Sequence, residues 1–125
     1  MNILHDVMFR GYCPEDDKWY FGDLEYARKR NVAKIHTYTE EGDYDKQHVV
    51  SPSSVGRFTG MVNFCGNGIY EGDIVKIHFG LGEIVGSVEY DNHNGCYVFV
   101  NETNRFSFNG IKPCNIEIVG NSYKK

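Results

Sequence analysis

Hydrophobic and polar residues alternate along much of the chain, which is the pattern of β-strands with one buried and one solvated face. Within one such run Val75, Ile77 and Phe79 fall on one face, and Lys76 and His78 fall on the other. No segment holds a helical period over about 12 residues. The pattern predicts a mostly β protein, with strands at residues 34–39, 73–79, 84–90, 96–100 and 116–119.

The N-terminal part adds a predicted hairpin. Apolar runs at residues 7–9 and 19–21 flank a stretch with Gly11, Pro14 and acidic residues 15–17, which is typical of a turn between two strands. The polar stretch 40–47 is predicted to be a turn. Residues 24–32 have two interpretations, one or two turns of helix or a strand followed by a loop.

Proline and serines at residues 51–54 interrupt the strand pattern and give the predicted lobe boundary. We expect an N-terminal β-rich lobe at residues 1–53 and a C-terminal part at residues 54–125. In the latter, short strands joined by glycine turns predict a small β-barrel. Both parts are expected to form one compact unit.

Composition supports a folded chain. Of 125 residues, 41% are hydrophobic and 24% charged, which excludes an intrinsically disordered protein. The net charge is −4, whereas duplex-binding proteins usually carry a basic surplus, so non-specific DNA packaging is disfavoured.

The first residues lack the unbroken apolar stretch of a signal peptide, and no segment reaches the roughly 20 apolar residues of a membrane-spanning helix. We therefore expect a cytoplasmic protein without membrane contact. A reducing cytosol would keep the widely spaced cysteines as thiols that pack as small hydrophobic residues. These are Cys13, Cys65, Cys96 and Cys114.

Motifs for metal, cofactor or nucleophilic chemistry are missing from the sequence. His93 and Cys96 are the one pair of metal-binding residue types that lie close in the sequence. A second such pair, which a metal site usually needs, is missing from the sequence, so no metal site is predicted. Gly80-Leu81-Gly82 is too short for a dinucleotide fingerprint and indicates a tight strand connection. No cofactor is expected, and an enzyme with a Cys-His or carboxylate pair stays open as a third function class.

Basic and aromatic residues interleave at one place. Arg28, Lys29, Arg30 and Lys34 follow the aromatic residues Tyr20, Phe21 and Tyr26. Single-strand binders use cations along phosphates and rings against bases. The alternative is a solvated loop beside core aromatics. A second charged stretch, with Glu40, Glu41, Asp43 and Asp45, is either a phosphate mimic or a charged hairpin tip.

Six short sequence motifs, taken in order, closely resemble those of the YopX-like protein family of phages and prophages. They lie at residues 9–11, 19–24, 55–60, 69–75, 86–90 and 117–121, and the most specific is Tyr-Glu-Gly-Asp-Ile-Val at residues 70–75. Arg57 stands where the family often has Gln, and Asn67 where it often has Lys. The resemblance covers almost the whole chain.

The resemblance implies a small, mostly β phage or prophage protein with a barrel-like C-terminal part, and we expect that part to be an SH3-like barrel. The resemblance implies no particular biochemical activity, because none is established for the family. Gly72 is predicted to form a turn that enters the next strand, and the other motif residues are expected to be structural as well. The motif residues are Phe9, Arg10, Gly11, Trp19, Gly22, Gly56, Gly60, Tyr70, Gly72 and Asp73.

The expected function is that of a non-enzymatic accessory protein that binds another macromolecule or associates with itself as a homo-oligomer. The alternative is a nucleic-acid-associated protein that uses Arg28, Lys29, Arg30 and Lys34.

Overall fold

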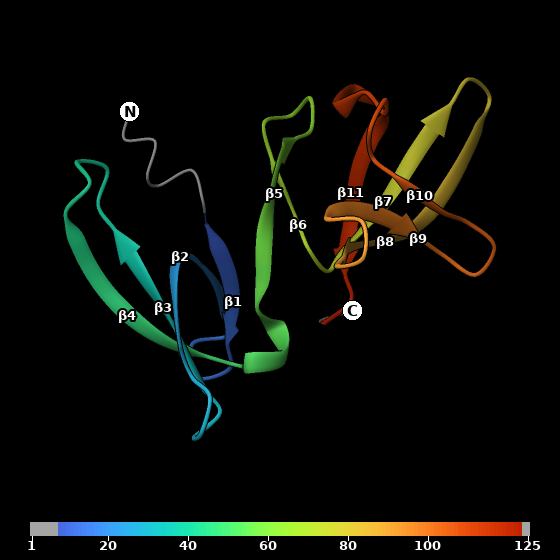
Figure 1. Cartoon of the computed structure of the whole chain (residues 1–125). Coiled ribbons are helices and arrows are strands. Elements are labelled where there is room, and N and C mark those ends of the chain that lie inside the picture. Colours follow the sequence, from blue (N-terminus) through green and yellow to red (C-terminus); the bar gives the residue numbers. More distant parts are fainter. Residues whose placement is uncertain (1–7, 124–125) are drawn as a thin grey trace. The chain divides into compact units, whose positions relative to one another are not determined.

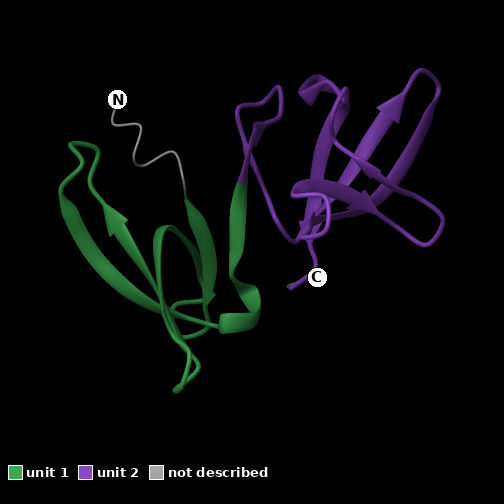
Figure 2. Cartoon of the chain, viewed as in Figure 1, with its two compact units in different colours: residues 1–58 green, residues 59–125 purple. Residues whose placement is uncertain are grey.

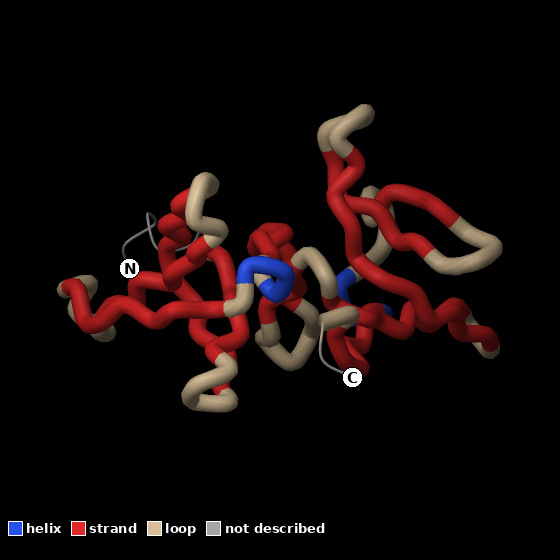
Figure 3. The backbone as a smooth tube through the Cα atoms, turned by 90° about the horizontal axis from the view of Figure 1, so that it is seen from below, coloured by secondary structure: helices blue, strands red, loops and turns tan. Residues whose placement is uncertain are grey.

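The computed structural model describes residues 8–123, and the regular secondary structure in this part of the chain is almost all β-strand (Figure 1). The mostly β fold is therefore confirmed. The helical elements within residues 8–123 are two short 3₁₀ turns, η2 (Pro52–Ser54) and η3 (Pro113–Asn115), seen as the blue segments in Figure 3. The strands are β1 (Phe9–Cys13), β2 (Lys18–Ala27), β3 (Val32–Tyr38), β4 (Tyr44–Val50), β5 (Gly56–Val62), β6 (Gly68–Tyr70), β7 (Asp73–Phe79), β8 (Gly82–Asp91), β9 (Cys96–Val100), β10 (Arg105–Ser107) and β11 (Ile116–Asn121).

The chain forms two compact units, residues 1–58 and 59–125 (Figure 2). Strand β5 crosses from the first unit into the second, and its first residues pair with β1. The predicted boundary at residues 53 and 54 falls in η2, just before β5.

The first unit is an antiparallel sheet in the order β4-β3-β2-β1. One of its faces buries a small core of Cys13, Ala33, Ile35 and Val50. These side chains meet because alternate residues of neighbouring strands point to the same face of a sheet. Tyr20 and Leu24 pack at the edge of this core.

The second unit contains an antiparallel sheet in the order β10-β9-β8-β7-β11, so the last strand returns beside the first one of this sheet. Its core is larger than that of the first unit. It consists of Ile69, Val75, Ile77, Val88, Phe99, Phe108 and Ile116.

A tight turn leads into β7. Gly72 has a φ of 95°, a left-handed conformation that favours glycine, and its N–H donates to the Val88 carbonyl at 2.8 Å. The side chain of Asp73, only 1% exposed, accepts a hydrogen bond from the Tyr70 N–H at 2.8 Å. The Tyr-Glu-Gly-Asp run thus closes its own turn with a buried carboxylate.

The predicted strands at residues 73–79 and 96–100 have the bounds that the structure shows. Val75 and Ile77 are buried as the alternation predicts, but Phe79, at the end of β7, is 47% exposed. Residues 24–32 form the end of β2, a turn and the start of β3, so the strand-and-loop interpretation is correct. The prediction of a turn through residue 47 is wrong, because β4 already begins at Tyr44. Its first four side chains are exposed, so the alternation of buried and exposed residues is missing from the first half of this strand. Val7 of the predicted hairpin lies outside the described residues.

Candidate functional site

The three adjacent cations lie together at the turn between β2 and β3. Arg28, Lys29 and Arg30 are all exposed. The turn is closed by a hydrogen bond from the Asn31 N–H to the Arg28 carbonyl at 3.2 Å, and Asn31 adopts a left-handed φ of 53°. Within residues 8–123 none of the three cations forms an ion pair. Their charge therefore faces solvent.

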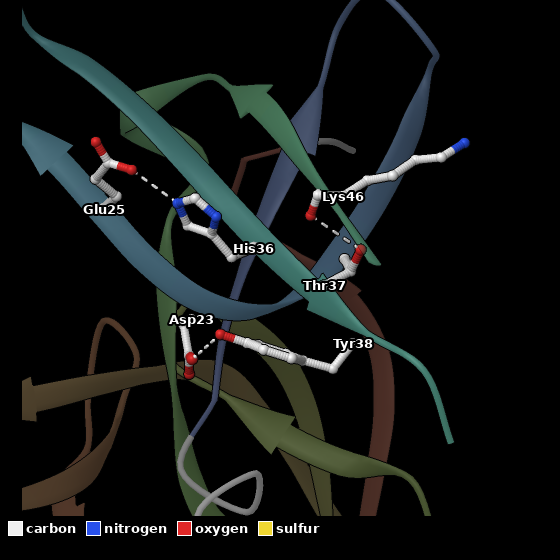
Figure 4. Close-up of polar contacts among 6 residues, drawn as sticks. All are labelled: Asp23, Glu25, His36, Thr37, Tyr38 and Lys46. Atoms are coloured by element: carbon white, nitrogen blue, oxygen red, sulfur yellow. Dashed lines mark hydrogen bonds and ion pairs between the residues drawn. The ribbon is translucent and has the colours of Figure 1, made fainter. Parts of the chain in front are cut away.

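Lys34 lies apart from the turn, half-buried on β3 directly across from Glu25 of β2. The Glu25 carboxylate forms a hydrogen bond with the Nε2 atom of His36 at 2.7 Å (Figure 4). The hydrogen bond from His36 holds the pKa of Glu25 below its ordinary value of 4.5, and the charges of Lys34 and Arg30 act in the same direction. The structure thus places Lys34 opposite a carboxylate and leaves the turn cations exposed to solvent.

This geometry predicts an acid-sensitive contribution to stability. A carboxyl whose pKa is lowered by folding stabilises the protein above its unfolded pKa, and that stabilisation is lost as pH falls through the folded pKa. Glu25→Gln is therefore expected to lower the melting temperature slightly at pH 7 and to match the wild type once both are measured well below the ordinary pKa of 4.5. Thermal melts at the two pH values check this. A difference that persists undiminished in acid would contradict it.

Further side-chain contacts tie β3 to both neighbours. The Tyr38 hydroxyl donates to Asp23 of β2 at 2.7 Å, and this bond raises the pKa of Tyr38. The Thr37 hydroxyl donates to the Lys46 carbonyl of β4 at 3.2 Å (Figure 4). Beyond β3 the chain enters an exposed acidic turn with Glu40, Glu41 and Asp43. One strand thus has a basic turn before it and an acidic turn after it.

Tyr26 borders an apolar pocket beside the basic turn. The pocket has a volume of about 280 Å³ and is lined by Leu24, Tyr26, Ala33, Pro52 and Val55. The Tyr26 side chain is 47% exposed, and its hydroxyl donates to the Asn31 Oδ1 atom at 2.7 Å. Sequence reasoning named Tyr26 as an aromatic neighbour of the cations. It missed Pro52 and Val55, which follow β4 in the chain and carry no local signal for a pocket.

The other two aromatic neighbours differ in their environment. Tyr20 packs against the core of the first unit and stacks on His48, with ring centroids 3.5 Å apart. Phe21 is 45% exposed. The interpretation of the aromatics as core residues therefore fits Tyr20 and does not fit Phe21 or Tyr26.

The N-terminal motif residues form contacts within the sheet. The guanidinium of Arg10 lies 4.9 Å from the ring centroid of Trp19, which is half-buried, and Tyr12 packs on the same ring. Gly11 and Gly22 leave room for close neighbours, the Val50 side chain and the His36 carbonyl respectively. Phe9 packs at the edge of the core, Gly56 is buried and pairs with Arg10, and Gly60 has a φ of 87°.

Comparison with protein families gives a match to the model described as "YopX protein" over residues 8–125. The chain belongs to the YopX family. Comparison with curated proteins and with solved structures yields no significant match. The match extends over nearly the whole YopX chain and includes residues of both units.

The second unit of this YopX chain contains another pocket, of about 460 Å³, whose lining includes Cys65, Cys114 and His78. The ring nitrogens of His78 contact carboxylates: Nε2 lies 3.2 Å from Glu117 and Nδ1 lies 3.7 Å from Glu83. The Cys114 thiol contacts the Asn115 side chain at 3.9 Å. The structure therefore brings thiols and an imidazole to one pocket, but in the described residues it does not join them by a hydrogen bond as nucleophile and base.

His93 and Cys96 lie at the connection between β8 and β9. Asp91 organises this turn, because its side chain accepts hydrogen bonds from the backbone N–H groups of His93 and Asn94. Over residues 8–123 no three side chains of metal-binding type are grouped to hold an ion. In the same part of the chain, no helix has the length and hydropathy needed to cross a membrane. All four cysteines are free thiols. Cys13 is buried as predicted, but Cys65 and Cys114 are exposed, so the prediction that they pack as small hydrophobic residues is wrong for these two.

Proposed function

We propose that this YopX protein is a non-enzymatic accessory protein of a phage or prophage, acting in the host cytoplasm, that binds an anionic macromolecule through the turn between β2 and β3. The observation that carries the proposal is the exposure of three adjacent cations, Arg28, Lys29 and Arg30, without ion-pair partners among residues 8–123. Solvated cations of this kind attract polyanions by releasing condensed counterions.

The negative net charge implies that polyanions can bind only at a locally basic part of the surface. At a net charge of −4 the protein as a whole repels polyanions, so attraction depends on the place where cations outnumber anions. Salt screens exposed charges over a Debye length of about 8 Å at physiological ionic strength. The basic turn therefore acts independently of acidic residues farther away.

We also propose that the second unit is an SH3-like barrel. Two observations support this: its five strands form a meander whose last strand returns beside the first, and η3 lies immediately before that last strand. Barrels of this kind present exposed side chains on a stable frame, but fold likeness alone assigns no partner.

Replacing Arg28, Lys29 and Arg30 by alanine is expected to remove retention on a heparin column, because these residues supply the local positive charge. Wild type should elute at clearly higher salt. The matched control replaces Lys18, Lys46 and Lys112 by alanine, three exposed cations outside the turn. Both triple variants have a net charge of −7, that is −4 minus 3. The control is expected to elute near the wild type.

Equal elution of the two variants would contradict the proposal, since net charge alone would then explain retention. If neither variant differs from wild type and the mass measured by sedimentation rises with protein concentration, self-association becomes the favoured function.

A further inference from the structure

We infer that the anionic partner is a single-stranded nucleic acid, with one base stacked on the Tyr26 ring in the adjoining pocket and the neighbouring phosphates on Arg28, Lys29 and Arg30. This inference rests on the proposed function and specifies the partner of the same site. It adds a second recognition element, because the apolar pocket contributes contacts that a purely electrostatic site lacks.

The pocket is suited to one flat ring. Its volume of about 280 Å³ is just below the range of typical small-ligand sites, which begins near 300 Å³, so it has room for one ring and not for a larger ligand. Leu24, Ala33, Pro52 and Val55 supply apolar walls, and Tyr26 supplies an aromatic one. A base has an apolar face and a polar edge, so it can stack inside while its edge stays in water.

Tyr26 is held ready for stacking. Its hydroxyl donates to the Asn31 side chain at 2.7 Å, and the Asn31 N–H closes the turn onto Arg28. The ring is thus fixed to the same turn that carries the cations, although the side chain is 47% exposed. A fixed ring loses little conformational freedom on binding, which favours stacking.

The charge next to the ring favours a nucleic acid over other anions. Tyr26 precedes Arg28 by two residues, and Arg28 is the first of three successive cations. In a single strand every base carries its own phosphate, so a base on the ring brings phosphates to the turn, and arginine can also stack on a neighbouring base. In a duplex the bases are already stacked and paired, so the ring finds no free face.

The test compares two labelled oligomers by fluorescence anisotropy: oligo(dT) of about 12 nucleotides and an abasic oligomer of the same length and charge. At about 50 mM salt the wild type is expected to bind oligo(dT) at least about fivefold more tightly than the abasic oligomer. With three cations engaged, the log–log salt slope for oligo(dT) should be about −2.

Variants separate the two parts of the site. Tyr26→Ala should abolish the preference for oligo(dT) over the abasic oligomer, whereas Tyr26→Phe keeps the ring and should retain most of that preference. The matched control is Tyr44→Ala, a tyrosine on β4 that is 55% exposed, and it should behave like the wild type. The triple alanine variant of the turn should weaken binding of both oligomers.

Equal wild-type affinity for the two oligomers would overturn this inference. If heparin retention still depends on the turn cations, the proposed function stands and only the nucleic-acid partner falls. If an acidic peptide with one central leucine binds in a Tyr26-dependent manner while oligo(dT) does not, the pocket serves a protein partner and the inference is again wrong. Loss of the heparin effect as well would remove the proposed function itself.

Discussion

Alanine at Gly22 is expected to destabilise the first unit by about 3 kcal/mol or more, at the upper end of the cost of overpacking. A methyl group at this position would overlap the carbonyl oxygen of His36 on the neighbouring strand and lie 2.9 Å from its carbonyl carbon. A flexible side chain could move aside, but the backbone of a paired strand cannot move without breaking the sheet. Urea unfolding monitored by tryptophan fluorescence measures the effect, because Trp19 lies on the same strand as Gly22 and is the single tryptophan.

The matched control for this substitution is Gly120→Ala. A methyl group there meets no atom within 4 Å, and the same change in chemistry should alter stability by no more than about 0.5 kcal/mol. A Gly22→Ala variant as stable as this control would show that β2 and β3 can separate slightly at no cost. The close approach would then have no structural importance.

Alanine at Phe99 is expected to cost about 3–5 kcal/mol, the usual range for a phenylalanine removed from a core. Phe99 is fully buried in the second unit. Its ring stacks on Phe106 at a centroid distance of 4.9 Å and meets Phe108 edge-on at 6.4 Å. The substitution therefore opens a cavity and removes two aromatic contacts at once. Thermal unfolding followed by far-ultraviolet circular dichroism measures the loss.

Phe64→Ala makes the same chemical change at a side chain that is 74% exposed. It should shift the unfolding transition by only a few degrees at most, since it leaves no buried cavity. Similar shifts in the two variants would mean that the second unit tolerates loss of its central ring, and would argue against a single well-packed core there.

Sequence reasoning located two kinds of strand with their exact bounds, the alternating strand at residues 73–79 and the short apolar run at residues 96–100. At residues 73–79 the buried side chains Val75 and Ile77 alternate with half-buried ones, so the period is visible in the sequence. At Tyr44 to Gln47 every side chain is exposed, and nothing in the sequence distinguishes this edge strand from a polar turn. The three-residue strands β6 and β10 are too short to show a period at all.

The candidate site was visible in part for a related reason. Arg28, Lys29 and Arg30 are neighbours in the sequence, so their proximity could be predicted without knowledge of the fold. The pocket could not be predicted in this way, because Pro52 and Val55 approach Leu24 and Ala33 only after three strands have paired. The need for glycine at position 22 has the same origin, since the carbonyl that excludes a side chain belongs to His36 on the next strand.

The opposite charges of the turns before and after β3 have a consequence for the kinetics of encounter. A strand of seven residues separates them by about 20 Å, which exceeds the Debye length of about 8 Å, so the two ends do not neutralise each other. An approaching polyanion attracts the basic turn and repels the acidic turn. These two opposite forces exert a torque that rotates the domain. Collisions are thereby biased toward the orientation in which Arg28, Lys29 and Arg30 lead, and fewer random encounters are wasted.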